Sequence, residues 1–235
     1  MVSMNQKAKV TKYLVIAMVT LVLFSYINAS FNQLRAALHY YKANNLLTQW
    51  RESEKINSQG DYILAKETAQ KAVELSNNNP LYLDVLADIY QWGLYQKLES
   101  DPVNVTKKAM QLYKLSIQNR PSWPVTWANM AVLKWRNGEF DENFKFYLSQ
   151  ADKFGKSQPE VHLLFTELGL AAYQARHPLY TQYKQTIKHR IYNAILSPQS
   201  RDKALSLIEK YEQRRIICRW LTKENNGYVL RLAKC

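Results

Sequence analysis

The sequence predicts an all-α protein in which one membrane helix precedes a right-handed superhelix of helical repeats. Apolar residues return at three- and four-residue spacing along almost the whole chain, which is the period of an amphipathic helix. Only 6 glycines and 7 prolines occur in 235 residues, so the chain offers few of the turn signals that punctuate a strand-rich fold. Two segments share one helix–turn–helix pattern, which indicates a scaffold that binds other proteins.

A membrane anchor is predicted at residues 13–31. This stretch contains no charged side chain and is about as long as a helix that crosses the hydrocarbon core. Three lysines precede it on a short tail. We therefore expect residues 1–12 in the cytoplasm and the main domain in the periplasm, held at a bacterial inner membrane. A cleaved signal peptide is the alternative, although cleavage after Ala29 or Ser30 lacks a good small-residue motif.

The repeats are recognised by a shared order of small and aromatic residues. In the first segment the pattern runs through Gly60, Tyr62, Ala65, Ala69, Ala72 and Pro80, and in the second through Trp127, Met130, Ala131, Gly138, Phe140, Tyr147 and Ala151. This order resembles the tetratricopeptide repeat, in which stacked helix pairs form a superhelix. The resemblance implies a helical-repeat domain over residues 32–175. Its first helix is weakly patterned, and one long helix continuing from the anchor through residues 32–58 is the alternative.

The same resemblance implies a groove that binds a protein partner. In the first helix of each of two repeats, the inward-facing positions include the predicted groove residues Asp84, Asp88, Trp92, Val132, Trp135 and Arg136. Tryptophan and arginine often dominate the energetics of interfaces. The alternative is that each tryptophan packs inside the stack. Trp50 and Glu54 occupy positions where chaperone-tail clamps need lysine and asparagine, which disfavours a co-chaperone.

Positive charge is concentrated at the C-terminal end, residues 176–235, which are predicted as basic helices followed by a hairpin. They hold 13 basic and 4 acidic groups of a chain whose net charge is +13. The predicted basic patch consists of Lys184, Lys188, Arg190, Arg214, Arg215 and Arg219. Such a field favours acidic polysaccharide or anionic lipid headgroups, and nucleic acid is not expected. A solvated basic surface without a ligand is the alternative.

The two cysteines, Cys218 and Cys235, are a candidate disulfide. Asn226-Gly227 is a strong two-residue hairpin signal, and a β-hairpin that turns there sets Cys218 opposite Cys235, within disulfide reach. The bond requires an oxidising compartment. Two alternatives stay open, a helix that continues to Leu221 and a pair of free thiols.

The sequence contains no motif for catalysis, a metal or a cofactor. The four histidines stand apart, and neither a Gly-rich phosphate loop nor a nucleophile elbow occurs. We therefore expect a protein that is not an enzyme and needs no cofactor or metal.

One stretch has a more specific likeness. It combines WANMA at residues 127–131, GEFDE at 138–142, PEV at 159–161 and ELGL at 167–170, followed by Cys218. With the N-terminal span, these motifs resemble the VpsP-like family of small single-span proteins linked to bacterial exopolysaccharide biosynthesis. The resemblance implies a pathway rather than a reaction. The resulting hypothesis is a periplasmic adaptor for proteins of an envelope polysaccharide machine; the alternative is a direct binder or modifier of acidic polysaccharide through the basic end.

Overall fold

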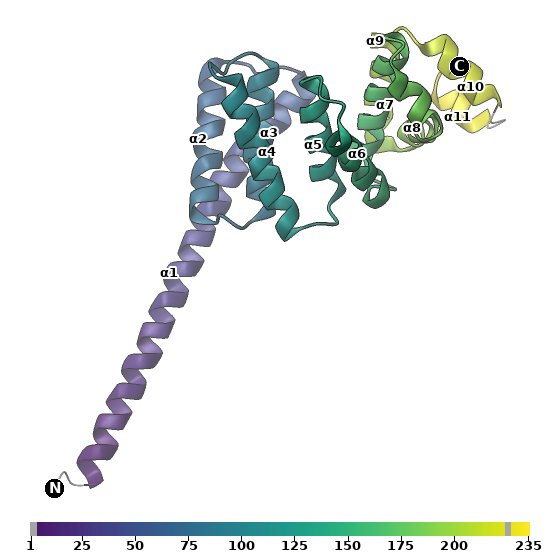
Figure 1. Ribbon diagram of the computed structural model, residues 1–235. Helices are drawn as coiled ribbons and strands as arrows, with labels where there is room; N and C mark the ends of the chain where they lie inside the picture. Colours follow the sequence, from purple (N-terminus) through teal and green to yellow (C-terminus); the bar gives the residue numbers. More distant parts are fainter. Residues whose placement is uncertain (1–3, 224–226) are drawn as a thin grey trace. The chain divides into compact units, whose positions relative to one another are not determined.

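The computed structural model describes the backbone of residues 4–223 and 227–235, and the side chains of the first helix from Lys12 onward. The described residues form helices and no strand, which confirms the all-α class (Figure 1). The helices are α1 (Met4–Ser53), α2 (Gln59–Leu75), α3 (Pro80–Tyr95), α4 (Pro102–Asn119), α5 (Pro124–Arg136), α6 (Glu142–Phe154), α7 (Pro159–Gln174), α8 (Pro178–Leu196), α9 (Pro198–Lys210), α10 (Arg214–Lys223) and α11 (Gly227–Leu232).

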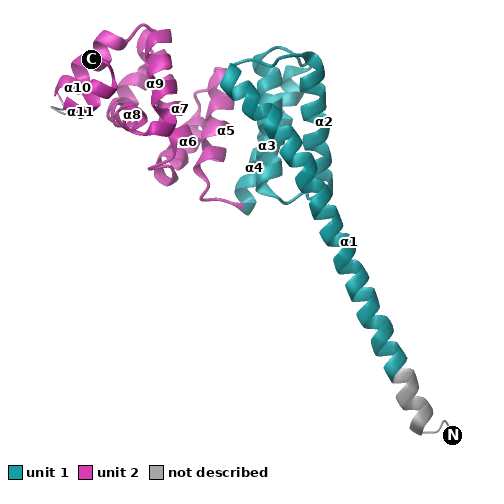
Figure 2. Cartoon of the chain, turned by 180° about the vertical axis from the view of Figure 1, so that it is seen from behind, with its two compact units in different colours: residues 1–119 teal, residues 120–235 magenta. Residues whose placement is uncertain are grey.

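The helices form two compact units, which Figure 2 distinguishes by colour. Unit 1 is residues 1–119 and contains α1 to α4; unit 2 is residues 120–235 and contains α5 to α11. Consecutive helices pack as pairs within each unit: α1 with α2, α3 with α4, α5 with α6, and α7 with α8. This pairing is the arrangement expected of a helical-repeat domain. The predicted boundary between the repeat domain, residues 32–175, and the basic C-terminal region, residues 176–235, lies inside unit 2.

Local sequence signals set many helix starts. Six helices begin at a proline, which is favoured at the first helical position because its missing N–H would have no helical partner there. The side chain of Asn79 accepts a hydrogen bond from the backbone N–H of Leu81 at the start of α3, and Asp141 accepts one from Phe144 in α6. Both are capping contacts. The boundaries of these helices therefore follow from residues within one turn.

The first helix joins the predicted anchor to the repeats without a break. α1 is 50 residues long, and in the described part of the chain it alone is long and apolar enough to cross a membrane, a test that a signal sequence also meets. Beyond residue 31, Ala36, Ala43, Leu47 and Trp50 are fully buried, and α1 packs on α2 and α3. The alternative of one long helix running from the anchor into the first repeat is the arrangement observed.

The C-terminal β-hairpin predicted from Asn226-Gly227 is wrong. Residues on both sides are helical, in α10 and α11, whereas Asn226 lies outside the described residues. In α10, Ile217 and Leu221 are one helical turn apart and both are buried, while Arg219 between them is exposed. That spacing buries one helix face. The apolar period, rather than the turn dipeptide, decides the structure of this segment.

Cys218 and Cys235 form a disulfide in the structure, with an S–S distance of 2.04 Å and a Cα–Cα distance of 5.5 Å. Cys218 lies in α10 and Cys235 follows α11. The bond therefore joins α10 to the residue three positions after α11, and not two strands; the alternative of a helix that continues to Leu221 still permits this bridge.

Candidate functional site

Unit 2 contains a basic cleft between α8 and α10. Its volume is about 260 Å³, and it is lined by Gln185, Lys188, His189, Ile191, Tyr192, Ile217, Trp220 and Leu221. Ile191, Ile217 and Leu221 are buried and supply an apolar floor. The volume lies just below the range of roughly 300–1,000 Å³ that is typical of ligand pockets. The cleft is therefore suited to one small ring or headgroup rather than to a long enclosed ligand.

Trp220 is the aromatic centre of this cleft. Its ring stacks on that of Tyr180, with centroids 6.2 Å apart and planes inclined by 21°, and meets the edge of Tyr173 at 6.3 Å. The Nζ atom of Lys188 lies 5.2 Å from the Trp220 ring centroid, within reach of a cation–π interaction. The ammonium group is thus held at the cleft by a neutral partner, and it forms no ion pair with the residues that the structure describes.

The electrostatic environment of the cleft favours an anion. None of its eight described lining residues is acidic. Lys184 on α8 and Arg215 and Arg219 on α10 are exposed and lie on the two helices that form its walls. Cations without nearby carboxylates attract negatively charged ligands. Trp220 itself was not among the predicted site residues, although a tryptophan directly after Arg219 on a basic amphipathic segment is a usable signal.

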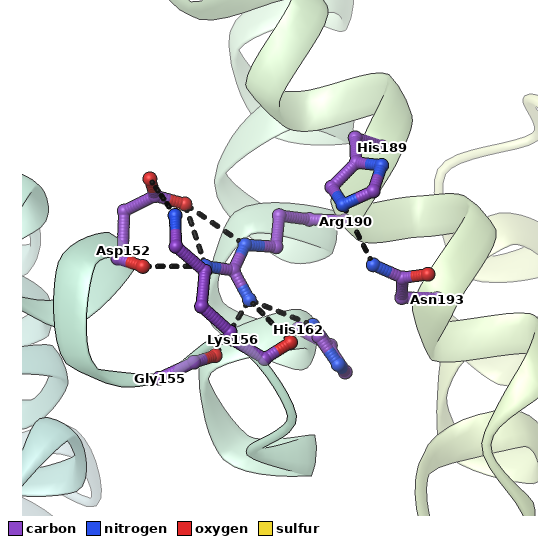
Figure 3. Close-up of polar contacts among 7 residues, drawn as sticks. All are labelled: Asp152, Gly155, Lys156, His162, His189, Arg190 and Asn193. Atoms are coloured by element: carbon purple, nitrogen blue, oxygen red, sulfur yellow. Dashed lines mark hydrogen bonds and ion pairs between the residues drawn. The ribbon is translucent and has the colours of Figure 1, made fainter.

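Arg190 was predicted in the surface basic patch, and this assignment is wrong. Its side chain is only 1% exposed, and Figure 3 shows it reaching from α8 to the end of α6. Its Nε donates to Asp152 Oδ1 at 2.9 Å, and Nη2 donates to the Asp152 carbonyl at 2.8 Å. Nη1 donates to the carbonyls of Gly155 and Lys156. Arg190 therefore caps the C-terminal end of α6 and joins two helix pairs of unit 2.

His162 completes the arginine cluster from α7. Arg190 Nη1 lies 3.1 Å from His162 Nδ1, and because arginine can only donate, this nitrogen is the acceptor of a neutral imidazole. Burial and the neighbouring Arg190 charge lower the pKa of His162 to about 4. Burial raises the pKa of Asp152, but the hydrogen bonds from Arg190 and Lys156 outweigh it and the pKa falls below its ordinary value. The cluster therefore joins α6, α7 and α8.

Arg214 was predicted in the surface basic patch, but its side chain makes contacts within unit 2. It forms an ion pair with Glu209, and its Nη1 donates to the carbonyl oxygens of Ala233 at 2.9 Å and Lys234 at 3.1 Å. These carbonyls follow α11, so Arg214 holds the end of the chain against α10. The surface patch is consequently smaller than predicted, consisting of Lys184, Lys188, Arg215 and Arg219.

The predicted groove residues of unit 1 are largely occupied by intramolecular contacts. Asp88 is 8% exposed, forms an ion pair with Arg51, and accepts a hydrogen bond from the Tyr113 hydroxyl at 2.5 Å. The Trp92 ring lies 6.4 Å from that of Trp50. Asp84 is half-buried on the same helix. Asp88 is therefore a core carboxylate, and its assignment to an open groove is wrong.

The groove residues predicted on α5 belong to unit 2 and differ in exposure. Val132 and Trp135 are partly exposed, and Arg136 is exposed. Next to them, Lys134 is buried and forms ion pairs with Glu139 and Asp141, the latter at 2.9 Å. Burial lowers the pKa of Lys134, but its hydrogen bonds to Glu139 and Asp141 prevail and raise it overall. Trp135 and Arg136 are thus among the predicted groove residues whose side chains reach solvent.

Comparisons with known proteins add no family to this description. No protein-family model matches the chain, and no curated protein has a similar sequence. Within the described residues, no group of three or more histidine, cysteine, aspartate or glutamate side chains is arranged to hold a metal ion. The function must therefore be inferred from the residues of the chain.

Proposed function

We propose that this protein is a non-catalytic, membrane-anchored adaptor in the biosynthesis of a bacterial envelope polysaccharide. The observation that carries the proposal is the continuity of α1, which runs from an apolar stretch into the buried core of a helical-repeat unit. A span joined without a linker keeps the first repeats at the membrane surface. The resemblance to the VpsP-like family supplies the pathway, and helical repeats commonly serve as binding scaffolds.

In this proposal residues 1–12 lie in the cytoplasm and the repeats lie in the periplasm of an inner-membrane protein. The Cys218–Cys235 disulfide supports this compartment, since such bonds persist in the periplasm and are rare in the cytosol. The test is labelling of intact cells with a maleimide mass tag, with and without reduction. Labelling only after reduction is expected. The periplasmic placement would be contradicted if both thiols resisted an impermeant reagent in intact cells and were labelled after lysis without reduction.

Retention of the anchor is tested by the mass of the protein extracted from membranes. The intact chain has a mass of 27.5 kDa. We expect that mass, because cleavage near Ala29 would sever α1 and separate the repeats from the membrane. A shorter mature protein would favour the signal peptide.

The protein partner is expected to contact the exposed side chains of α5. Trp135→Ala combined with Arg136→Ala should reduce recovery of the partner in a pull-down from detergent-solubilised membranes. Lys153→Ala is a matched control, because Lys153 is exposed on α6 in the same unit. Unchanged recovery with the α5 variant would exclude this surface.

A second function is favoured by the cleft, namely direct binding of acidic polysaccharide. Lys188 beside Trp220, above an apolar floor and without a lining carboxylate, suits a carboxylate-bearing sugar ring. The full chain in neutral detergent should bind polygalacturonate but not dextran, and binding should weaken with salt. Lys188→Ala or Trp220→Ala should each weaken binding by about tenfold.

Lys184→Ala separates the cleft from the general field. Lys184 is exposed one turn before Lys188 on α8, so its loss removes the same charge without touching the cleft. We expect its effect to be smaller than that of Lys188→Ala. Equal losses for the two variants would show a diffuse basic surface instead of a site, and binding of anionic vesicles without polysaccharide binding would favour lipid headgroups.

A further inference from the structure

The helix that contains the anchor has a second apolar face that the repeats do not cover. Phe31, Leu34, Leu38 and Tyr41 are 58%, 57%, 63% and 61% exposed. They are separated by three, four and three residues, and the same spacing continues back to Ile27 and Phe24, which are also exposed. Apolar residues at alternating three- and four-residue spacing are the a and d positions of a heptad repeat. We call these six residues the seam.

The seam lies opposite the face of α1 that packs on unit 1. The packed face consists of Ala36, Tyr40, Ala43, Leu47 and Trp50, which occupy the c and f positions of the same heptads. At about 100° per residue, the centres of the two faces are roughly 160° apart. The rest of unit 1 therefore leaves the seam open, and a helix docked on it would meet no clash with α2 or α3.

Lipid does not account for the whole seam. The charge-free stretch ends at Phe31, and at about 1.5 Å per residue Leu38 lies roughly 10 Å and Tyr41 roughly 15 Å farther along the axis. The polar headgroup layer adds only about 5–8 Å on each side of the hydrocarbon core. The last two residues of the seam thus extend past the bilayer, where water would otherwise contact them.

The charged residues beside the seam favour a parallel orientation of the partner helix. In this heptad the e positions hold Arg35 and Lys42, and the g positions hold Ser30, Ala37 and Asn44. In a parallel pair each e residue faces a g residue of the partner, so both cations face neutral side chains. An antiparallel pair would set Arg35 and Lys42 against the same cations of the second helix. Two copies anchored in one membrane with the same orientation meet the parallel requirement.

The extent of the seam also fits a second copy. The four residues from Phe31 to Tyr41 alone would bury less than the roughly 1,200 Å² that a stable interface usually needs. The seam continues into the apolar stretch through Phe24 and Ile27, so contact outside the membrane and within it forms one surface. It ends where Asn45 and Thr48 occupy the next a and d positions.

From these observations we propose that the protein is a parallel homodimer, joined along the seam of α1. The two copies of unit 1 lie on the outer sides of the paired helices, because the packed face is opposite the seam. Every binding surface is then present twice at one place in the membrane, which increases the avidity for a polymer or a multivalent partner. The proposal does not depend on the identity of that partner.

Cysteine crosslinking of the full chain in membranes tests the dimer. Cys218 and Cys235 are paired in the structure, so one introduced cysteine provides the free thiol. Leu34→Cys and Leu38→Cys should give a disulfide-linked homodimer on mild oxidation. Gln33→Cys is the control, since Gln33 is exposed beside Leu34 but points away from the seam. Equal crosslinking at positions 33 and 34, none at 34 and 38, or a bond to a different protein would each overturn the proposal.

A charge placed in the seam provides a second measurement. Leu38→Glu leaves the packed face of α1 unchanged, so the repeats should stay folded by circular dichroism. It should weaken dimerisation in detergent by on the order of tenfold or more, measured by energy transfer between labelled copies. Gln33→Glu should have little effect. A Leu38→Glu protein that dimerises as tightly as the parent chain would also refute the seam.

Discussion

Each unit contains an Asp–Arg ion pair that joins distant segments, but the two units bury opposite members of the pair. In unit 1 the side chain of Asp88 is 10% exposed and that of Arg51 is 49% exposed. In unit 2 the side chain of Arg190 is 1% exposed and that of Asp152 is 31% exposed. The same chemistry therefore places the negative charge inside one unit and the positive charge inside the other.

Arg190, the most buried of these four side chains, shows what a buried charge needs. Arg190 donates to Asp152, to two backbone carbonyls beyond α6 and to His162. A buried charge needs this many partners because its solvation by water is lost. Arg51 and Asp152 keep access to water, so the loss of a protein contact should cost them less. The energetic effect of a substitution should accordingly depend on which member it removes.

Removing Arg190 should have the largest effect. Arg190→Met leaves Asp152 without its main cation and removes the donors of the α6 C-terminal carbonyls, so unit 2 should lose about 3–5 kcal/mol of stability. Amide hydrogen exchange read by mass spectrometry measures this, because peptides from unit 1 serve as an internal reference. Lys156→Ala, which removes an exposed partner of the same Asp152, should change the stability by at most about 1 kcal/mol. Similar protection in Arg190→Met and the parent chain would refute this role.

Acid should destabilise unit 2 through His162. The pKa of His162 is about 4 in the folded protein and 6.5 as its ordinary value, so between these pH values the unfolded chain binds more protons. Stability is full above pH 6.5, falls as the pH decreases toward 4, and loses about 3 kcal/mol at most. Arg190, His189 and Asp152 are the charged or titratable groups that act on this histidine.

Unfolding of unit 2 at pH 7 and pH 4.5 measures the acid effect, with His162→Gln as the comparison. The glutamine variant should be less stable at pH 7 but less sensitive to acid. The same pH dependence in both proteins would mean that carboxylates, and not His162, cause the loss.

Asp88→Asn should have an intermediate effect on unit 1. Asparagine retains an acceptor for the Tyr113 hydroxyl but removes the charge that pairs with Arg51. A loss of about 1–3 kcal/mol is expected for a buried hydrogen bond to a charged group. Hydrogen exchange of α3 and α4 peptides measures it, with unit 2 peptides as the reference. A variant with unaltered protection would show that the charge of Asp88 is not needed in the core.

Arg51→Ala should have the smallest effect, although it breaks the same ion pair. Half of the Arg51 side chain is exposed, so its removal should change the stability by about 0–1 kcal/mol, and water can reach Asp88 through the space left. The comparison of Asp88→Asn with Arg51→Ala tests directly whether the buried member of the ion pair contributes more to stability than the exposed member. If Arg51→Ala is as destabilising as Asp88→Asn, burial does not decide which partner matters.

Much of the fold follows from local signals. The charge-free stretch at residues 13–31, the prolines at helix starts and the caps at Asn79 and Asp141 all act within a turn or two of helix. The pairing of successive helices follows from their apolar stripes. Even the candidate disulfide was recognisable, because the chain contains only Cys218 and Cys235. The strand pairing assumed for it was wrong, since Ile217 and Leu221 already carried a helical period.

The helices, the apolar N-terminal stretch and the excess of positive charge near the C-terminus could be predicted without a structure, because these features depend on composition and on neighbours in the chain. Which charged side chains are buried depends on contacts between distant segments, and these became visible in the folded chain. Arg190 and Asp88 have the same local pattern as solvated residues on a helix surface. Their partners, Asp152 and Gly155 for one and Arg51 and Tyr113 for the other, lie between 25 and 38 positions away. Desolvation and pairing of charge across such separations depend on packing, which no local period encodes.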